Sequence, residues 1–112
     1  MRAASAVALA AAALLAGCGG GATAPATSPR TTPLSPQERH GRTLFVRSCG
    51  ACHELADAGT HGSAGPSLDE HPWRDVYVRE VIASGPGLMP AELLRGADAD
   101  AVAGYVAAAT KR

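Results

Sequence analysis

The feature that most constrains this chain of 112 residues is one pentapeptide, Cys49-Gly50-Ala51-Cys52-His53. Its two thiols are separated by two small residues, and an imidazole follows directly. A cysteine pair with this spacing can form a disulfide, bind a metal ion or attach haem. The fold must therefore present two thiols and one imidazole together at a tight turn.

Cys-x-x-Cys-His is a signature of covalent c-type haem attachment. The two thiols add to the two vinyl groups on one side of the porphyrin, and the adjacent His lies under the iron as its proximal ligand. A thioredoxin-like site would need a βαβ context, which the sequence lacks. A four-ligand zinc site would need two more closely spaced ligands, whereas His61 and His71 are ten residues apart. The motif therefore predicts one covalent haem c held by Cys49, Cys52 and His53.

A second axial ligand to the haem iron is predicted at Met89, the only methionine after Met1. It lies in the run Gly-Pro-Gly-Leu-Met-Pro at residues 85–90, and Gly and Pro favour a stiff loop with tight turns. An axial Met has to come from a loop that covers the opposite face of the haem. The alternatives are that His61 or His71 is the second ligand and that Met89 fills the core.

The first 17 residues are predicted to be an export signal. Arg2 is the only charge before an apolar stretch at residues 3–16, which is too short to span a bilayer. The stretch ends Leu15-Ala16-Gly17-Cys18, which resembles the lipobox of bacterial lipoproteins. The resemblance implies cleavage before Cys18 and a lipid anchor on this residue. The alternative is an ordinary signal peptide with an incidental cysteine.

Residues 19–34 are rich in Gly, Pro, Thr and Ala, and they contain no large apolar side chain before Leu34. Such a segment cannot bury enough surface to fold. We therefore expect the lipidated Cys18 and a flexible tether over residues 18–34, followed by one small domain at 35–112. Ten basic residues balance ten acidic ones, which argues against nucleic acid as a partner. A domain this small buries little apolar surface of its own, so a cofactor is expected to complete its core.

A first helix is predicted from the capping signal Ser35-Pro36-Gln37-Glu38 to about Cys49. Its apolar and small residues recur every three or four positions and share one face with the haem motif: Gly41, Leu44, Phe45, Ser48, Cys49 and Cys52. A loop at residues 55–72 follows.

Two further helices and one short segment are predicted after that loop. The second helix covers residues 73–83, ends at the breaker cluster 84–87, and has an apolar stripe of Trp73, Tyr77, Val78, Val81 and Ile82. A short helical segment is expected at residues 91–94. The last helix spans about 98–110, with an apolar face of Val102, Tyr105, Val106 and Ala109. No stretch alternates with period two, so the expected fold class is all-α.

Residues 35–112 resemble a class I cytochrome c of the short bacterial kind. Gly41 and Phe45 match a glycine and an aromatic of that family's first helix, and Val102 and Tyr105 match its last helix. The family packs these two helices across each other, and Gly41 would let the backbones approach. The resemblance implies a small cytochrome c fold, with three to four helices wrapped around one haem.

Two loop elements extend the resemblance. Gly65-Pro66-Ser67-Leu68 is similar to the family's Gly-Pro-x-Leu element, whose proline carbonyl accepts a hydrogen bond from the ligating His. This implies that Pro66 orients His53. Met89-Pro90 is similar to the family's Met-Pro element, although the interval of 36 residues from His53 to Met89 is short. Residues that contact the haem propionates have no motif, and the candidates are Trp73, Arg74 and Arg95.

A haem with His and Met ligands has no open position for a substrate, so its natural work is one-electron transfer. We therefore expect an exported mono-haem electron carrier rather than an enzyme. Its partners would be redox proteins, respiratory or other, and its lipid would hold it at the outer face of the cytoplasmic membrane or at a periplasmic membrane surface.

Three alternatives remain open from the sequence. The chain could be a haem-binding subunit of a larger oxidoreductase. It could be a haem sensor or peroxidase if Met89 does not ligate the iron. It could also be a lipoprotein without haem, whose Cys49–Cys52 pair is a redox disulfide.

Overall fold

The computed structural model describes residues 31–111. The predicted signal peptide, Cys18 and the tether as far as residue 30 therefore lie outside the described residues. Leu34, which was assigned to the tether, packs against the core of the domain. Within the described part of the chain, no helix is both long enough and apolar enough to cross a membrane.

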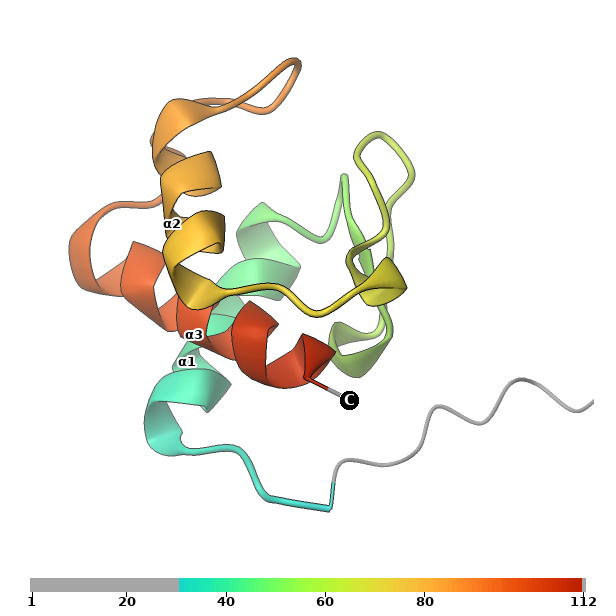
Figure 1. Ribbon diagram of the computed structural model, residues 1–112, viewed down its shortest axis with the longest axis vertical. Helices are drawn as coiled ribbons and strands as arrows, with labels where there is room; N and C mark the ends of the chain where they lie inside the picture. The colour runs from blue at the N-terminus through green and yellow to red at the C-terminus, as the bar shows by residue number, and fades with distance from the viewer. Residues whose placement is uncertain (1–30, 112) are drawn as a thin grey trace, which may run out of the picture.

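Three α-helices form the frame of the domain, and short elements link them (Figure 1). The helices are α1 (Pro36–Ser48), α2 (Asp75–Ser84) and α3 (Gly96–Thr110). Between α1 and α2 the chain forms β1 (Glu54–Leu55), the 3-10 turn η1 (Ala56–Ala58), β2 (Thr60–His61) and the 3-10 turn η2 (Leu68–Glu70). The expectation of a small, mainly helical domain is confirmed for the described residues.

Helix α1 begins at the predicted capping box. The backbone N–H of Glu38 donates to Ser35 Oγ over 3.2 Å, and the N–H of Ser35 donates to Glu38 Oε2 over 2.7 Å. These two bonds satisfy donors that the first turn of a helix leaves without a partner. Pro36 occupies the first helical position, where its missing N–H costs nothing.

Helices α1 and α3 cross at Gly41 with almost no space between their backbones. A Cβ atom at Gly41 would lie 2.1 Å from the carbonyl oxygen of Ala101 and 2.9 Å from Tyr105 Cβ. Beside this contact the ring of Phe45 meets Tyr105 edge to face, with centroids 6.1 Å apart. Both rings are buried, so the predicted apolar faces of the two helices are confirmed.

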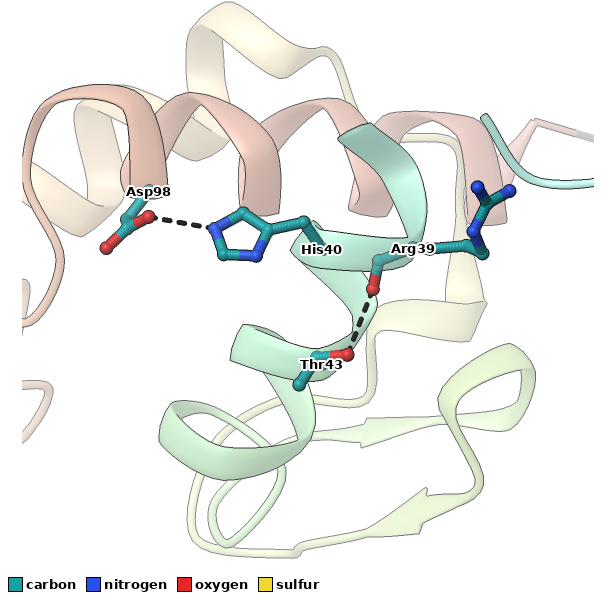
Figure 2. A network of polar contacts seen from close by, with 4 residues as sticks. All are labelled: Arg39, His40, Thr43 and Asp98. Carbon is teal, nitrogen blue, oxygen red and sulfur yellow. Dashed lines mark hydrogen bonds and ion pairs between the residues drawn. The ribbon is translucent and has the colours of Figure 1, made fainter. Parts of the chain in front are cut away.

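Polar contacts join the same two helices at the surface. His40 Nε2 on α1 lies 3.0 Å from Asp98 Oδ1 near the start of α3, and Figure 2 shows the two side chains pointing toward each other. In the same view Thr43 Oγ1 donates to the carbonyl oxygen of Arg39 within α1. Both side chains of the His40–Asp98 pair are more than half exposed, so the pair contributes little to stability. Packing at Gly41 therefore dominates this crossing.

The structure also departs from the sequence predictions between α1 and α2 and in the loop after α2. Glu54–Leu55 and Thr60–His61 pair as a two-stranded antiparallel sheet, which the all-α expectation omitted because two-residue strands show no alternation. The helical segment expected at 91–94 is wrong. Glu92 has a φ of 51°, a left-handed conformation that a right-handed helix cannot contain.

Candidate functional site

The end of α1 folds the motif into a closed turn. The carbonyl oxygen of Cys49 accepts hydrogen bonds from the N–H groups of both Cys52 and His53, each over 3.0 Å. This double acceptance reverses the chain immediately after the helix and brings the imidazole back toward Cys49. The local backbone therefore explains why two thiols and one imidazole within five residues can face one space.

Two glycines, Gly50 within the turn and Gly62 outside it, let neighbouring segments pack closely around it. A Cβ atom at Gly50 would lie 2.5 Å from Thr60 Cγ2, and a Cβ atom at Gly62 would lie 2.5 Å from the carbonyl carbon of Cys52. Thr60 Oγ1 also donates to the carbonyl oxygen of His53 over 2.9 Å. The close packing at Gly50 and Gly62 and the hydrogen bond from Thr60 thus hold the motif against β2 and the residue that follows it.

His53 is oriented by the loop that follows β2. Its Nδ1 lies 2.9 Å from the carbonyl oxygen of Pro66. Because a carbonyl can only accept, Nδ1 carries the proton, and Nε2 is left with a free lone pair for a metal. Gly65 lies directly against the ring, since a Cβ atom there would be 2.5 Å from His53 Cε1. The contact implied for Pro66 by the family resemblance is therefore present.

A cavity of about 390 Å³ opens beside the motif. Cys49, Cys52 and His53 line this cavity. Met89 also lines it, although it lies 36 positions after His53 in the sequence. Neither His61 nor His71 is among the lining residues. The cavity therefore brings together the predicted attachment residues and the predicted Met ligand, and it leaves out both alternative histidines.

The walls of this cavity come from all three helices and from two loops. All five residues of the apolar stripe predicted for the second helix face it: Trp73, Tyr77, Val78, Val81 and Ile82. Val102 and Val106 of α3 and Phe45 of α1 complete the apolar wall. In Figure 1 the loop after α2 (orange) and the loop after β2 (yellow-green) stand apart, and residues of both loops line the cavity. The volume lies within the range of pockets for small organic cofactors.

Trp73 fixes one wall through two hydrogen bonds. Its backbone N–H donates to Thr110 Oγ1 at the end of α3, and its indole Nε1 donates to the carbonyl oxygen of Leu68, each over 3.0 Å. Its ring also stacks on Tyr77, with centroids 5.6 Å apart. The indole N–H is therefore engaged within the protein. Arg74 and Arg95, the other candidates for propionate contacts, do not line the cavity.

The two cysteines of the motif have different surroundings. Cys49 is buried, whereas Cys52 is exposed. Burial, and to a lesser degree the neighbouring Cys52, raises the pKa of the Cys49 thiol to about 11. A thiol with a raised pKa is a weak nucleophile at neutral pH, because the thiolate is the reactive form.

A larger but shallow depression lies elsewhere on the surface, between the start of α1 and the helices α2 and α3. Its lining includes Glu38, Asp75, Arg79 and Asp100, and none of the motif residues. Arg79 and Asp100 pair with each other there. The smaller apolar cavity is therefore the candidate site, because the chemistry-bearing residues converge on it.

Comparison with known proteins agrees with this geometry. Residues 36–106 match the family model for subunit III of cbb3-type cytochrome c oxidase. The chain belongs to this family of c-type cytochrome domains. The crystal structure of the c-type cytochrome SorU from Sinorhizobium meliloti is 39% identical in sequence, with a TM-score of 0.62 over 66% of this chain and 91% of that one. No curated protein matches the chain.

Membership of the c-type cytochrome family establishes the cofactor as covalent haem c. The residues present fit this group: two thiols, an imidazole with Nε2 free, and a thioether line one uncharged cavity. The protein is therefore a mono-haem c-type cytochrome domain.

Proposed function

We propose that this cytochrome is an electron carrier anchored to a membrane by a lipid on Cys18. One observation carries the electron-carrier part: Met89 lines the same cavity as His53, whereas His61 and His71 do not. An iron held by both the thioether of Met89 and the imidazole of His53 would have no position left for a substrate. The bound haem c would supply a one-electron couple.

Residues of the chain would support this one-electron couple in three ways. Cys49 and Cys52 would hold the haem through thioethers, so that it cannot dissociate. Pro66 fixes the proton of His53 on Nδ1 and would leave Nε2 as the ligand. The apolar wall of α2 and α3 would exclude water from the haem faces, which helps to set the reduction potential.

A redox-difference spectrum with a Met89→Ala variant tests the ligand assignment. We expect the reduced wild-type protein to show a six-coordinate low-spin haem. The variant should have a lower reduction potential and should bind external ligands at the iron, since the thioether is gone. A variant spectrum identical to wild type would refute Met89 as a ligand. A five-coordinate wild-type haem would instead favour the sensor or peroxidase alternative.

The domain division and the anchor come from the sequence, because residues 1–30 lie outside the described part. We propose a signal peptide at residues 1–17, a lipidated Cys18 with a tether over 18–34, and the cytochrome domain at 35–112. Mass spectrometry of the membrane-extracted protein should find one covalent haem and a lipid on an N-terminal Cys18. A mature protein that carries haem but begins at another residue would refute the lipid anchor and leave the electron-carrier function standing.

A second function is favoured by the family comparison. The matching family is described as an oxidase subunit, so this chain could serve as the haem-binding subunit of a larger oxidoreductase. Purification from mild detergent distinguishes the two functions. A carrier is expected to purify alone, whereas a subunit is expected to retain partner chains in fixed ratio.

A further inference from the structure

The face of α1 that points away from α3 carries a row of basic residues. Gly41 and Phe45 contact α3, and they mark the inner side of the helix. The residues on the opposite side are exposed and are spaced three or four positions apart: Arg39, Arg42, Thr43, Val46 and Arg47. We call this row the arginine stripe. It holds three positive charges and no acidic residue.

The arginine stripe lies outside the haem cavity. None of its five residues lines that cavity, so their exposure does not depend on the haem. Figure 2 shows Arg39 pointing away from the pair of His40 with Asp98, which joins α1 to α3. The stripe and the haem cavity are therefore separate surfaces of the domain.

Positive charge is concentrated on this stripe in a domain that is otherwise acidic. The described residues include seven Lys and Arg residues and ten Asp and Glu residues, a net charge of −3 with neutral His. Three of the seven positive charges lie on the stripe, while Arg79 and Arg95 are paired with acidic side chains elsewhere. An anionic surface would attract this face of the domain and repel the rest, which would orient the molecule.

Two acidic residues lie beside the stripe and are turned into the fold. The carboxylate of Glu38 accepts a hydrogen bond from the N–H of Ser35 over 2.7 Å, and that of Asp57 accepts one from Tyr105 over 2.6 Å. Both acidic residues are half-buried, whereas the three arginines are exposed. A surface that approaches α1 therefore meets guanidinium groups first.

The proposed tether joins the domain at the start of this stripe. It leads from Cys18 to Ser35, the N-cap of α1, which lies one turn before Arg39. A flexible coil of the sixteen residues 19–34 spans roughly 20–24 Å, so a lipid on Cys18 would keep α1 close to the bilayer. A tethered site meets its surface at an effective concentration in the millimolar range, so weak attraction is sufficient.

We propose that the arginine stripe of α1 docks on the anionic phospholipid head groups of the membrane that holds the anchor. This inference rests on the proposed lipid anchor and adds the orientation of the carrier at the membrane. Guanidinium groups bind phosphate through two parallel hydrogen bonds, which suits arginine to this contact. Val46, 44% exposed between Arg42 and Arg47, would contact the apolar edge of the head-group region.

Vesicle sedimentation tests the stripe in the absence of the lipid. The protein is the mature holoprotein from residue 18 with the substitution Cys18→Ala, which keeps the tether and cannot be acylated. We expect it to sediment with vesicles of equal parts phosphatidylcholine and phosphatidylglycerol, and not with phosphatidylcholine alone. Salt at about 1 M should release it, because the Debye length falls to about 3 Å. Equal binding to both kinds of vesicle, or binding that survives this salt, would overturn the proposal.

Glutamine substitutions locate the surface. The triple variant Arg39→Gln, Arg42→Gln, Arg47→Gln should bind the anionic vesicles roughly 100-fold more weakly, since each cation near an anionic surface contributes about fivefold. Arg42 also donates to backbone carbonyl oxygens of η1 over 3.4 Å, so the haem spectrum and thermal melt of the variant are compared with wild type. Arg47→Gln alone, in the last turn of α1, should weaken binding about fivefold. Wild-type binding by these variants would overturn the proposal.

The matched control removes three positive charges from other elements. It is the triple variant Arg74→Gln, Arg79→Gln, Arg95→Gln, which changes the net charge by the same amount. Arg79 and Arg95 form exposed ion pairs, whose loss costs little stability. The control should bind the anionic vesicles nearly as well as wild type. A loss as large as that of the stripe variant would show that net charge, and not the stripe, governs binding.

Mass spectrometry of Cys18 separates this inference from the proposed anchor. Stripe-dependent vesicle binding by a chain whose native form has no lipid on Cys18 would retain the docking surface and refute the anchor. A lipid on Cys18 without stripe-dependent binding would retain the anchor and overturn the docking surface.

Discussion

The α1–α3 crossing and the haem cavity use the same two helices in opposite ways. At the crossing the backbones touch, and Phe45 and Tyr105 are 1% and 0% exposed. Beside it, Cys49 of α1 and Val102 of α3 face a space of about 390 Å³. One region is closed by the chain itself, and the other is shaped for haem c. Protein side chains alone therefore do not complete this core.

The loop after α2, which forms one wall of the cavity, makes few backbone hydrogen bonds. Within the loop after α2, the N–H of Met89 donates to Pro86 over 3.1 Å, and the N–H of Glu92 donates to Ile82 over 2.9 Å. Segments with few buried contacts have low local stability. The difference between the two regions thus predicts that loss of haem disturbs the cavity before it disturbs the crossing.

Removal of both attachment residues should have the largest effect. In the Cys49→Ala, Cys52→Ala double variant we expect no covalent haem and a domain without a cooperative thermal transition. Loss of haem leaves the apolar walls of the cavity facing water, and burial of apolar surface is the main favourable term in folding. The whole stability of a small domain is only about 5–15 kcal/mol, so this loss is expected to be decisive. Circular dichroism during heating measures the outcome.

Hydrogen exchange in the same variant gives the spatial test. Any remaining amide protection should lie in α1 and α3 around Gly41, and the loop after α2 should have none. A cooperative melt with wild-type protection around Met89 would show that the cavity is stable without haem.

Substitution of Gly41 by alanine should have the next largest effect on stability, because it disturbs the close packing of α1 against α3. The new Cβ would lie 2.1 Å from the carbonyl oxygen of Ala101, so α1 and α3 must move apart. We expect a loss of about 2–4 kcal/mol in unfolding free energy. Chemical denaturation of the holoprotein measures it.

Gly104 provides the matched control for this substitution. It lies inside α3, and a Cβ there would meet nothing within 4 Å. Gly104→Ala should therefore raise stability by up to about 1 kcal/mol, since alanine is the better helix former. If Gly41→Ala also stabilised the protein, the close crossing of α1 and α3 would be wrong.

The closed region was predictable from the sequence. Ser35 and Glu38 carry a capping signal, and the periodicity of Phe45, Val102 and Tyr105 marks two buried faces. Such patterns are local and follow from the geometry of one helix. The short strands and the conformation of Glu92 were missed, because both depend on contacts between segments that no helical pattern records.

The cavity was predictable only in part. The pentapeptide identified the attachment residues, and the Gly- and Pro-rich loop suggested Met89. Only the family resemblance suggested Pro66. Gly62 carried no signal, and Gly65 was noted only as part of the Gly-Pro-x-Leu element; their role is to leave space for the motif backbone and for His53.

The smallest effect is expected for Gly65→Ala, which changes the haem cavity and not the crossing of α1 and α3. A Cβ there would lie 2.5 Å from His53 Cε1 and 2.9 Å from Nδ1, so the ring must shift away from Pro66. A weaker Nδ1–H bond makes His53 a less basic ligand, which stabilises the oxidised iron less. We therefore expect the reduction potential to rise by less than ~60 mV, the value of a tenfold change in a one-electron equilibrium.

Stability of the holoprotein should change by under about 1 kcal/mol, because the haem thioethers and the α1–α3 crossing are untouched. Voltammetry and denaturation of both variants thus separate the two regions. Gly65→Ala should change the reduction potential, and Gly41→Ala should change the unfolding free energy. A potential equal to wild type for Gly65→Ala would mean that Pro66 does not tune His53.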